Sequence, residues 1–402
     1  MEELNQITLK IAVLDPTKTK NTYSFQQAEI LQGLMRKYAL KVGVALVISI
    51  ESCRNHEEVI RKLDDPNTIA LQPISNSSTG LVPYKVFETM ISEIGNLEFY
   101  GALDLKIDNR LIAHPDKVDL LLEENYKDID VVLTHSAPEG QCKKQIELIN
   151  KANPDRELKV INTFNSTTSA VDALNSEEFI GKNVVAIGNM ETANANKFEH
   201  TKTSWQDFPD DNFTTFLAIG NKNNVDWNLQ KFLHAFTKIH SESDKIDFIA
   251  SLPISDDLGS LGEFLSKLKE FGVDLNYIKV DTKNGKVQPY FSGTISCENK
   301  NRLEMSINGM EQKANLYTAY PHFNSKNANL GINSHFVGPY DIRLVDSDGG
   351  KVQITAKVPN YTGALADILQ QIKSKQINLT SLEVFARGCE SSAILNAEGV
   401  RV

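Results

Sequence analysis

Hydroxyl and amide side chains gather in a few short polar segments in the first half of this 402-residue chain, at residues 75–80, 134–142, 166–167 and 211–216. Such groups at loop-to-helix junctions, with the N–H groups of a helix start, can hold an anion and donate hydrogen bonds or protons to it. The ordinary alternative is that they are helix caps and polar turns, which use the same residue types.

The composition favours a protein that binds small molecules. Hydrophobic residues make up 41% of the chain and charged residues 23%, which is typical of globular proteins. The net charge is −10, whereas nucleic-acid binding needs a basic surface, so no nucleic-acid partner is predicted. The length predicts two or three domains.

Four cysteines are far apart and lack metal-ligand spacing, so free thiols and no metal site are predicted, at Cys53, Cys142, Cys297 and Cys389. The longest apolar run covers residues 42–50, far short of the ~20 residues that span a bilayer. No signal peptide is visible, and a cytoplasmic protein without a membrane partner is expected.

The elements that must position the polar segments follow an α/β pattern. Apolar alternation predicts a strand over residues 7–13, and Ser24 is the predicted cap of the helix that follows. Further strands are predicted at 44–50, 68–74, 111–112, 131–134, 160–163, 184–187 and 213–219. This order predicts a domain over residues 1–225 with a ligand cleft between two α/β lobes. Lobe 1 covers about 1–98 and 200–225, and lobe 2 about 99–199.

The second half has a different pattern. Residues 243–323 predict strands and helices in the order βαββαβ, including a helix near 258–271 that ends at Gly272. Residues 324–334 are rich in Asn, Ser and Gly and are predicted to be a linker. Residues 340–402 are similar to the first half of the preceding domain and are predicted to be a partial repeat.

Taken in order, the polar segments resemble motifs of the prephenate dehydratase family. The family's Asn-x-Thr-Arg-Phe is similar to Asn212–Phe216, and its Val-Pro-x-Glu-Asn-Ser-x-x-Gly to residues 72–80. Further matches are His135, Gln141, Cys142, Ser166, Thr167, Ala170 and residues 186–188. The resemblance implies a two-lobed catalytic domain like periplasmic binding proteins, followed by an ACT-like regulatory domain and a partial ACT-like repeat.

The resemblance also implies chemistry. Prephenate is a dianion, and loss of its ring carboxylate as carbon dioxide together with its hydroxyl group gives phenylpyruvate, without a cofactor. Thr214 would donate to the leaving hydroxyl, and Asn76 and Ser77 would orient the substrate. The remaining candidate substrate-binding residues are Ser166, Thr167, Thr215 and Phe216.

Two positions depart from the family's motifs. Thr215 stands where the family has an arginine, and Ser75 where it has a glutamate. An arginine pairs bidentately with a carboxylate, which a threonine cannot do. The standard reaction therefore needs substitute groups, for which Lys18 and Lys20 are candidates, and Thr215→Arg is expected to restore the clamp in a pocket that binds a dianion.

Three functions stay open at this point. A lyase that converts prephenate to phenylpyruvate is favoured over a non-aromatising prephenate decarboxylase. The third alternative is a catalytically impaired protein that binds an amino-acid effector. Candidate effector-binding residues by resemblance to ACT domains are Gly259, Ser260, Leu261, Gly363, Ala364, Leu365 and Glu383. The resemblance further implies a homodimer or homotetramer that assembles through the ACT-like domain.

Overall fold

The computed structural model divides into two compact units, residues 1–98 with 103–236, and residues 99–102 with 237–402. The structure describes residues 6–81, 97–240, 245–251, 260–296, 298–299, 315–320, 341–347, 351–359, 369, 378–387 and 390–398, apart from 153, 155, 157, 165, 211, 284 and 285. No described helix is long and apolar enough to cross a membrane.

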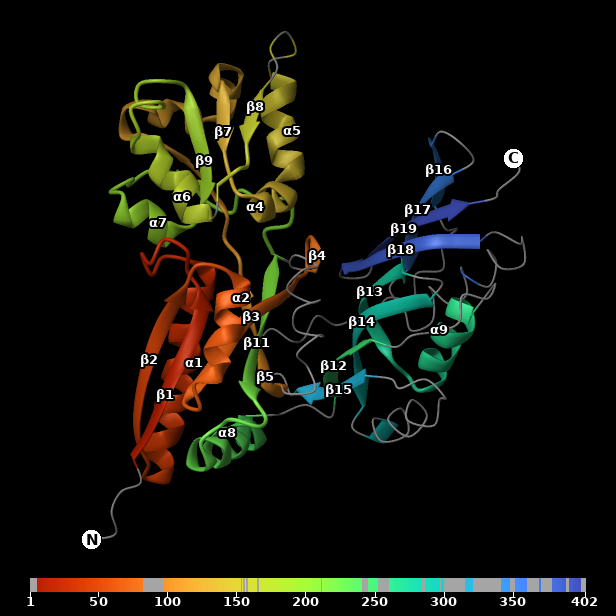
Figure 1. Ribbon diagram of the computed structural model, residues 1–402. Coiled ribbons are helices and arrows are strands. Elements are labelled where there is room, and N and C mark those ends of the chain that lie inside the picture. Colours follow the sequence, from red (N-terminus) through yellow and green to blue (C-terminus); the bar gives the residue numbers. More distant parts are fainter. Residues whose placement is uncertain are drawn as a thin grey trace. The chain divides into compact units, whose positions relative to one another are not determined.

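Lobe 1 of the first unit is built on a sheet with the strand order β2-β1-β3-β11-β5, in which β4 also pairs with β3 (Figure 1). The strands are β1 (Gln6–Leu14), β2 (Ala45–Cys53), β3 (Thr68–Asn76), β4 (Gly80–Leu81), β5 (Leu97–Lys106) and β11 (Phe213–Asn221). Strands β1, β2 and β3 are parallel, and β11 is antiparallel to β3. The chain thus returns to lobe 1 at β11, as predicted for residues 213–219.

The helices of lobe 1 are α1 (Tyr23–Val42), α2 (His56–Arg61), the 3₁₀ turn η1 (Lys62–Asp64) and α8 (Trp227–His240). Helix α1 begins earlier than predicted, because Thr22 and not Ser24 is its N-cap. The Thr22 backbone is extended and its hydroxyl accepts a hydrogen bond from the Phe25 N–H at 3.2 Å. The ring of Tyr38 on α1 packs against Phe232 and Phe236 of α8.

Lobe 2 has a second sheet, with the order β10-β6-β9-β7-β8. Its strands are β6 (Arg110–Ala113), β7 (Val131–Leu133), β8 (Lys159–Ile161), β9 (Val184–Gly188) and β10 (Thr201–Lys202). Its helices are α4 (Ser136–Gln141), α5 (Lys143–Ala152), α6 (Thr167–Asp172), α7 (Met190–Ala195) and the 3₁₀ turns η3 (Pro115–Leu121), η4 (Glu123–Asp128) and η5 (Ala173–Asn175).

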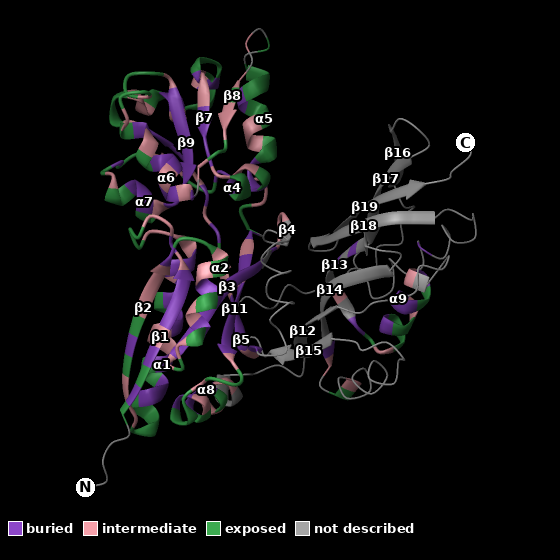
Figure 2. Ribbon diagram, viewed as in Figure 1, coloured by how far each residue is buried: buried purple, intermediate pink, exposed green. Residues whose placement is uncertain are grey.

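Strand β9 lies in the middle of lobe 2 and is buried throughout (Figure 2). Val185 and Ile187 join one hydrophobic cluster, and Val184 and Ala186 join a second. Since alternate residues of a strand point to opposite faces, both faces of the sheet are covered.

The second unit contains one eight-stranded sheet with the order β15-β12-β14-β13-β18-β19-β17-β16. Its elements are β12 (Lys245–Ser251), α9 (Ser260–Glu270), β13 (Asp274–Lys283), β14 (Lys286–Ser296), β15 (Asn315–Tyr320), β16 (Asp341–Ser347), β17 (Lys351–Pro359), β18 (Asn378–Arg387) and β19 (Glu390–Glu398). The second helix of the predicted βαββαβ order, over residues 301–310, lies outside the described residues.

The two halves of this sheet have matching strand orders. Strand β15 is antiparallel to β12, and β16 is antiparallel to β17, so β16 takes in the second half the place that β15 takes in the first. The sequence predicted a truncated repeat, whereas the structure supplies its outer strand from the segment that precedes β17. The halves meet at β13 and β18, where Lys279 is the register partner of Glu383.

Candidate active site

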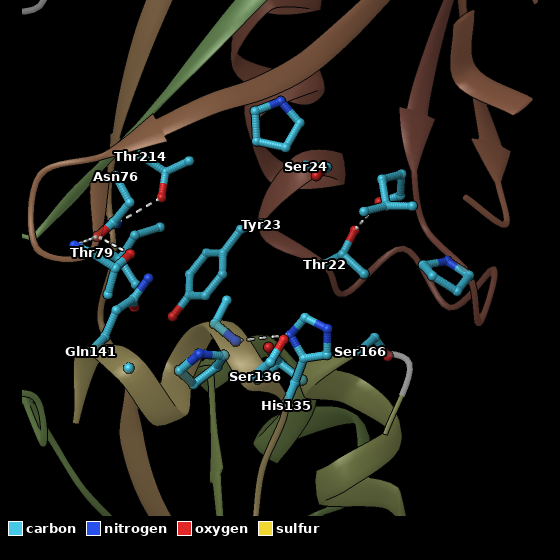
Figure 3. Close-up of a pocket in the computed structure, with 18 of the residues that line it drawn as sticks. Thr22, Tyr23, Ser24, Asn76, Thr79, His135, Ser136, Gln141, Ser166 and Thr214 are labelled. Atoms are coloured by element: carbon cyan, nitrogen blue, oxygen red, sulfur yellow. Dashed lines mark hydrogen bonds between the residues drawn. The ribbon is translucent and has the colours of Figure 1, made fainter. Parts of the chain in front are cut away.

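A cavity of about 580 Å³ in the first unit is lined by residues of both lobes. Figure 3 shows Asn76 and Thr214 from lobe 1 on one side, and His135, Ser136, Gln141 and Ser166 from lobe 2 on the other, with Tyr23 between them. Of the predicted substrate-binding residues, the structure brings together Asn76, Ser166, Thr167, Thr214 and Phe216. The polar segments that are far apart in the sequence therefore share one cavity.

An irregularity between β3 and β11 shapes the lobe 1 wall. Thr215 pairs with Ser75 and Phe216 with Pro73, so Ile74 is an extra residue on β3. Residues three apart on a regular strand point to opposite faces, yet Pro73 and Asn76 both line the cavity. The bulge at Ile74 accounts for this, and Pro73, which has no N–H to donate, is tolerated beside it.

Buried amide side chains connect the two lobes. Asn76 Nδ2 donates to Asn212 Oδ1 at 2.7 Å and to Thr214 Oγ1 at 3.0 Å. Gln141 Oε1, on α4 of lobe 2, accepts from Asn109 Nδ2 at 2.6 Å and from Asn212 Nδ2 at 3.1 Å. Because each amide has a defined donor or acceptor role, this network fixes the orientation of the side chains that face the cavity.

Thr214 is the hydroxyl that this network positions best. Its Oγ1 accepts the hydrogen bond from Asn76, so the hydroxyl proton is left to donate in another direction. The residue is 8% exposed and lines the cavity. Asn76 itself uses its Oδ1 to accept from the backbone and hydroxyl groups of Ser78 and Thr79, and so it builds the loop between β3 and β4.

The structure places Ser77 and Thr215 outside the cavity lining. Ser77 exchanges two hydrogen bonds with the Phe213 backbone, each 2.8 Å long, and so holds β3 against β11. Thr215 lies between two cavity residues on β11 and points the other way, where its hydroxyl donates to Asp104 Oδ1 at 2.7 Å. An arginine at position 215 would extend from the face of β11 opposite to Thr214.

Ser166 and Thr167 lie at the start of α6. Ser166 is the N-cap, and its hydroxyl oxygen accepts from the Ser169 N–H at 3.1 Å in a capping box. Both residues line the cavity, so the capping role and the cavity position coincide here. Lys18 and Lys20, the predicted substitutes for the missing arginine, are not among the lining residues.

Two histidines face the cavity in opposite tautomers. The Gln72 amide donates to the His56 carbonyl at 3.1 Å, so its Oε1 accepts from His56 Nδ1 at 2.8 Å, which leaves a lone pair on His56 Nε2. His135 caps α4 by accepting the Ala137 N–H at Nδ1, which puts its proton on Nε2. Burial lowers the pKa of both imidazoles, and the charge of His56 lowers that of His135 further.

Tyr23 occupies the middle of the cavity in Figure 3. Its hydroxyl donates to the Asp108 carbonyl at 2.9 Å. Burial raises the pKa of the phenol well above its usual value, so Tyr23 stays protonated and acts as an apolar ring with a fixed hydroxyl. No group of three or more His, Cys, Asp or Glu side chains within the described ranges could hold a metal ion.

Arg54, His56, Tyr23 and Asn109 are among the cavity residues that were not predicted from the sequence. Arg54 and His56 follow β2 directly, at the end of a parallel strand where ligands of α/β proteins commonly bind. Their position after a predicted parallel strand could have indicated a ligand-binding role, but they belong to no motif.

Fold and site together define a two-lobed α/β protein with a cavity between its lobes that is lined by amide, hydroxyl and apolar side chains. Residues 32–224 match the sequence model of the family described as prephenate dehydratase. Over these residues the chain is similar to the prephenate dehydratase family.

Solved structures share the fold. The prephenate dehydratase of Staphylococcus aureus subsp. aureus Mu50 is 18% identical, with 78% of this chain and 99% of that chain covered and a TM-score of 0.50. The prephenate dehydratase of Arthrobacter aurescens, solved in complex with L-Phe, is 16% identical, with 78% and 90% covered and a TM-score of 0.52.

A protein described as GqqA, a novel type of quorum quenching acylase, is 15% identical, with 78% and 98% covered and a TM-score of 0.50. A comparison with curated proteins finds no match. Because structures with different described activities share this fold, the function has to be argued from the site.

Proposed function

We propose that the first unit is a prephenate-directed lyase that removes carbon dioxide and hydroxide from prephenate to give phenylpyruvate. The observation that carries this proposal is the Thr214 hydroxyl, which accepts from Asn76 and is left to donate into the cavity. Departure of hydroxide needs such a donor, and one preorganised donor contributes about 10²–10³ in rate.

The remaining cavity fits a dianion with an apolar ring. Tyr23, Pro73 and Phe216 supply apolar surface, and no acidic side chain is among the described lining residues. His135 Nε2–H adds a second neutral donor. Ring carboxylate loss itself needs no protein acid, because aromatisation drives it; Thr214 therefore acts at the carbon–oxygen bond.

The test is incubation of the purified protein with prephenate, with the products followed by ultraviolet absorbance and mass spectrometry. Phenylpyruvate is the expected product. A dihydro-hydroxyphenylpyruvate would instead identify the non-aromatising decarboxylase, and unchanged prephenate would remove the proposal of a prephenate lyase.

We further propose that the second unit binds an amino-acid effector, as expected from its resemblance to ACT domains. Support comes from the sheet in which two similar halves meet at β13 and β18, with Glu383 in register with Lys279. The Arthrobacter aurescens protein was solved with L-Phe. Predicted effector residues 259 and 363–365 lie outside the described residues. A rise in unfolding temperature with phenylalanine, absent with alanine, is expected.

A further inference from the structure

The cavity has an uneven charge distribution. Of its described lining residues, Arg54 alone has a formal charge when the histidines are neutral, and none is Asp, Glu or Lys. Thr215 donates to Asp104 and so offers no donor to the cavity. A carboxylate that enters the cavity therefore finds one cationic group, at the turn between β2 and α2.

Arg54 is held in place by its neighbour on α2. Glu58 Oε2 accepts from the Arg54 backbone N–H at 2.9 Å and from its Nε at 3.1 Å. Asn55 fixes Glu58 in turn, since its Oδ1 accepts the Glu58 N–H at 2.8 Å. The hydrogen bond from Nε constrains the guanidinium plane, and the two Nη groups donate no hydrogen bond to the described residues.

This arrangement matches what bidentate carboxylate binding requires. A guanidinium presents a planar pair of N–H donors, and orientation in advance reduces the entropy lost on binding. The side chain of Arg54 is 74% exposed, so the charge is hydrated and costs little to keep in the empty cavity. His56 follows two residues later, and it also lines the cavity.

We infer that Arg54, in the β2–α2 turn, is the carboxylate anchor of this cavity. The inference deepens the proposed prephenate lyase function, since it assigns the group that binds a substrate carboxylate. It also extends to any small carboxylate with an apolar ring, which allows a test that does not depend on turnover.

The test compares 3-phenylpropanoate with 3-phenylpropanamide by isothermal titration calorimetry at low salt. The parent protein is expected to prefer the carboxylate. Arg54→Gln should weaken carboxylate binding by about tenfold or more, the value of a charged hydrogen bond, with amide binding unchanged. Arg61→Gln, which changes an exposed arginine at the end of α2 and outside the cavity, is the matched control and should stay within about twofold.

A third variant gives a change of opposite sign. Glu58→Gln keeps an acceptor for Arg54 but removes the compensating negative charge, so carboxylate binding should tighten by a few-fold. A merely structural role of Arg54 would not predict this gain. Equal loss of carboxylate and amide binding in Arg54→Gln, or a parent without carboxylate preference, would overturn the inference.

Prephenate turnover, measured on the same proteins, separates the two proposals. An Arg54-dependent carboxylate preference in a parent that leaves prephenate unchanged would support the anchor and remove the lyase. Prephenate turnover that is unaffected by Arg54→Gln, together with unchanged carboxylate binding, would retain the lyase and overturn the anchor.

Discussion

Neighbouring threonines on β11 have different surroundings. Thr214 faces the cavity and accepts from Asn76, whereas Thr215 donates to Asp104 on the other face. Thr215→Arg is therefore expected to leave prephenate turnover within about threefold of the parent, because the new guanidinium would lie near Asp104 and outside the cavity. Steady-state kinetics with prephenate checks this. An increase of tenfold or more would show that position 215 reaches the substrate.

The buried histidines predict a pH dependence of stability. Burial lowers the folded-state pKa of His56 and His135 below the usual 6.5, so below that pH the unfolded chain binds more protons. The contribution of these histidines to the free energy of unfolding is expected to be fully present above pH 6.5. It should decrease as the pH drops from 6.5 through the lowered pKa values. His56→Gln should flatten this dependence. Urea unfolding at pH 5.5, 6.5 and 7.5 measures it, and an unchanged slope would contradict the assignment.

At the scale of elements, the end of β9 determines where α6 lies. A Cβ at Gly188 would come 2.3 Å from Val171 Cγ2 on α6 and 2.9 Å from Ile112 Cδ1, so this close approach needs glycine. Gly188→Ala should lower the free energy of unfolding by about 1–3 kcal/mol through overpacking. It should also weaken ligand binding, because α6 presents Ser166 and Thr167 to the cavity.

Gly33, in the middle of α1, is the matched control because a Cβ there meets nothing within 4 Å. Gly33→Ala should raise stability by about 0.5–1 kcal/mol, the usual gain for alanine over glycine in a helix. Thermal and urea unfolding of both variants measures the two changes in the free energy of unfolding. Equal effects of the two substitutions would mean that α6 does not pack as closely on β9 as the structure places it.

Much of the fold was predictable from hydrophobic periodicity. Strand β1 shows apolar alternation and β9 is a buried apolar run, and the return of the chain at β11 followed from residues 213–219. The outer strand β16 was not predicted, because its place beside β17 depends on pairing across the sheet and not on local pattern. The same holds for the N-cap of α1, where Thr22 and Ser24 are both suitable residue types.

The site was predictable where motifs marked it. The alternation of a strand already implies that Thr215 faces away if Thr214 and Phe216 face inward, but the family's arginine at this position argued for a ligand contact. Arg54 and His56 belong to no motif, and only the packing of the β2–α2 turn brings them to the cavity. The bulge at Ile74, which turns both Pro73 and Asn76 inward, left no sequence signal beyond the proline itself.

At the scale of the whole molecule, the eight-stranded sheet has a consequence for assembly. Strand β13 has β14 on one side and β18 of the same chain on the other. The edge at which the two halves of this sheet meet is therefore occupied within one chain. A homodimer or homotetramer, proposed from the family resemblance, would need another surface of the second unit.

Engineered cysteines on β13 and β18 test whether these strands pair within one chain. Lys279 and Glu383 are register partners, and opposed Cα atoms in antiparallel strands are about 4.5–5.5 Å apart, within the range of a disulfide. Lys279→Cys with Glu383→Cys should give an oxidised monomer on a non-reducing gel, which each single variant should not form. Covalent dimers as the main product would show that the halves pair between chains.

We propose that this chain removes carbon dioxide and hydroxide from prephenate with Thr214 as the donor to the leaving hydroxyl. The most direct measurement is prephenate turnover by the parent, Thr214→Val and Thr215→Val, followed through phenylpyruvate absorbance. The parent and Thr215→Val should form phenylpyruvate at rates within about threefold, whereas Thr214→Val should lose about 10²–10³ in kcat, the value of one donor to a developing charge. Phenylpyruvate formation by Thr214→Val at the parent rate, or no formation by the parent, would contradict the claim.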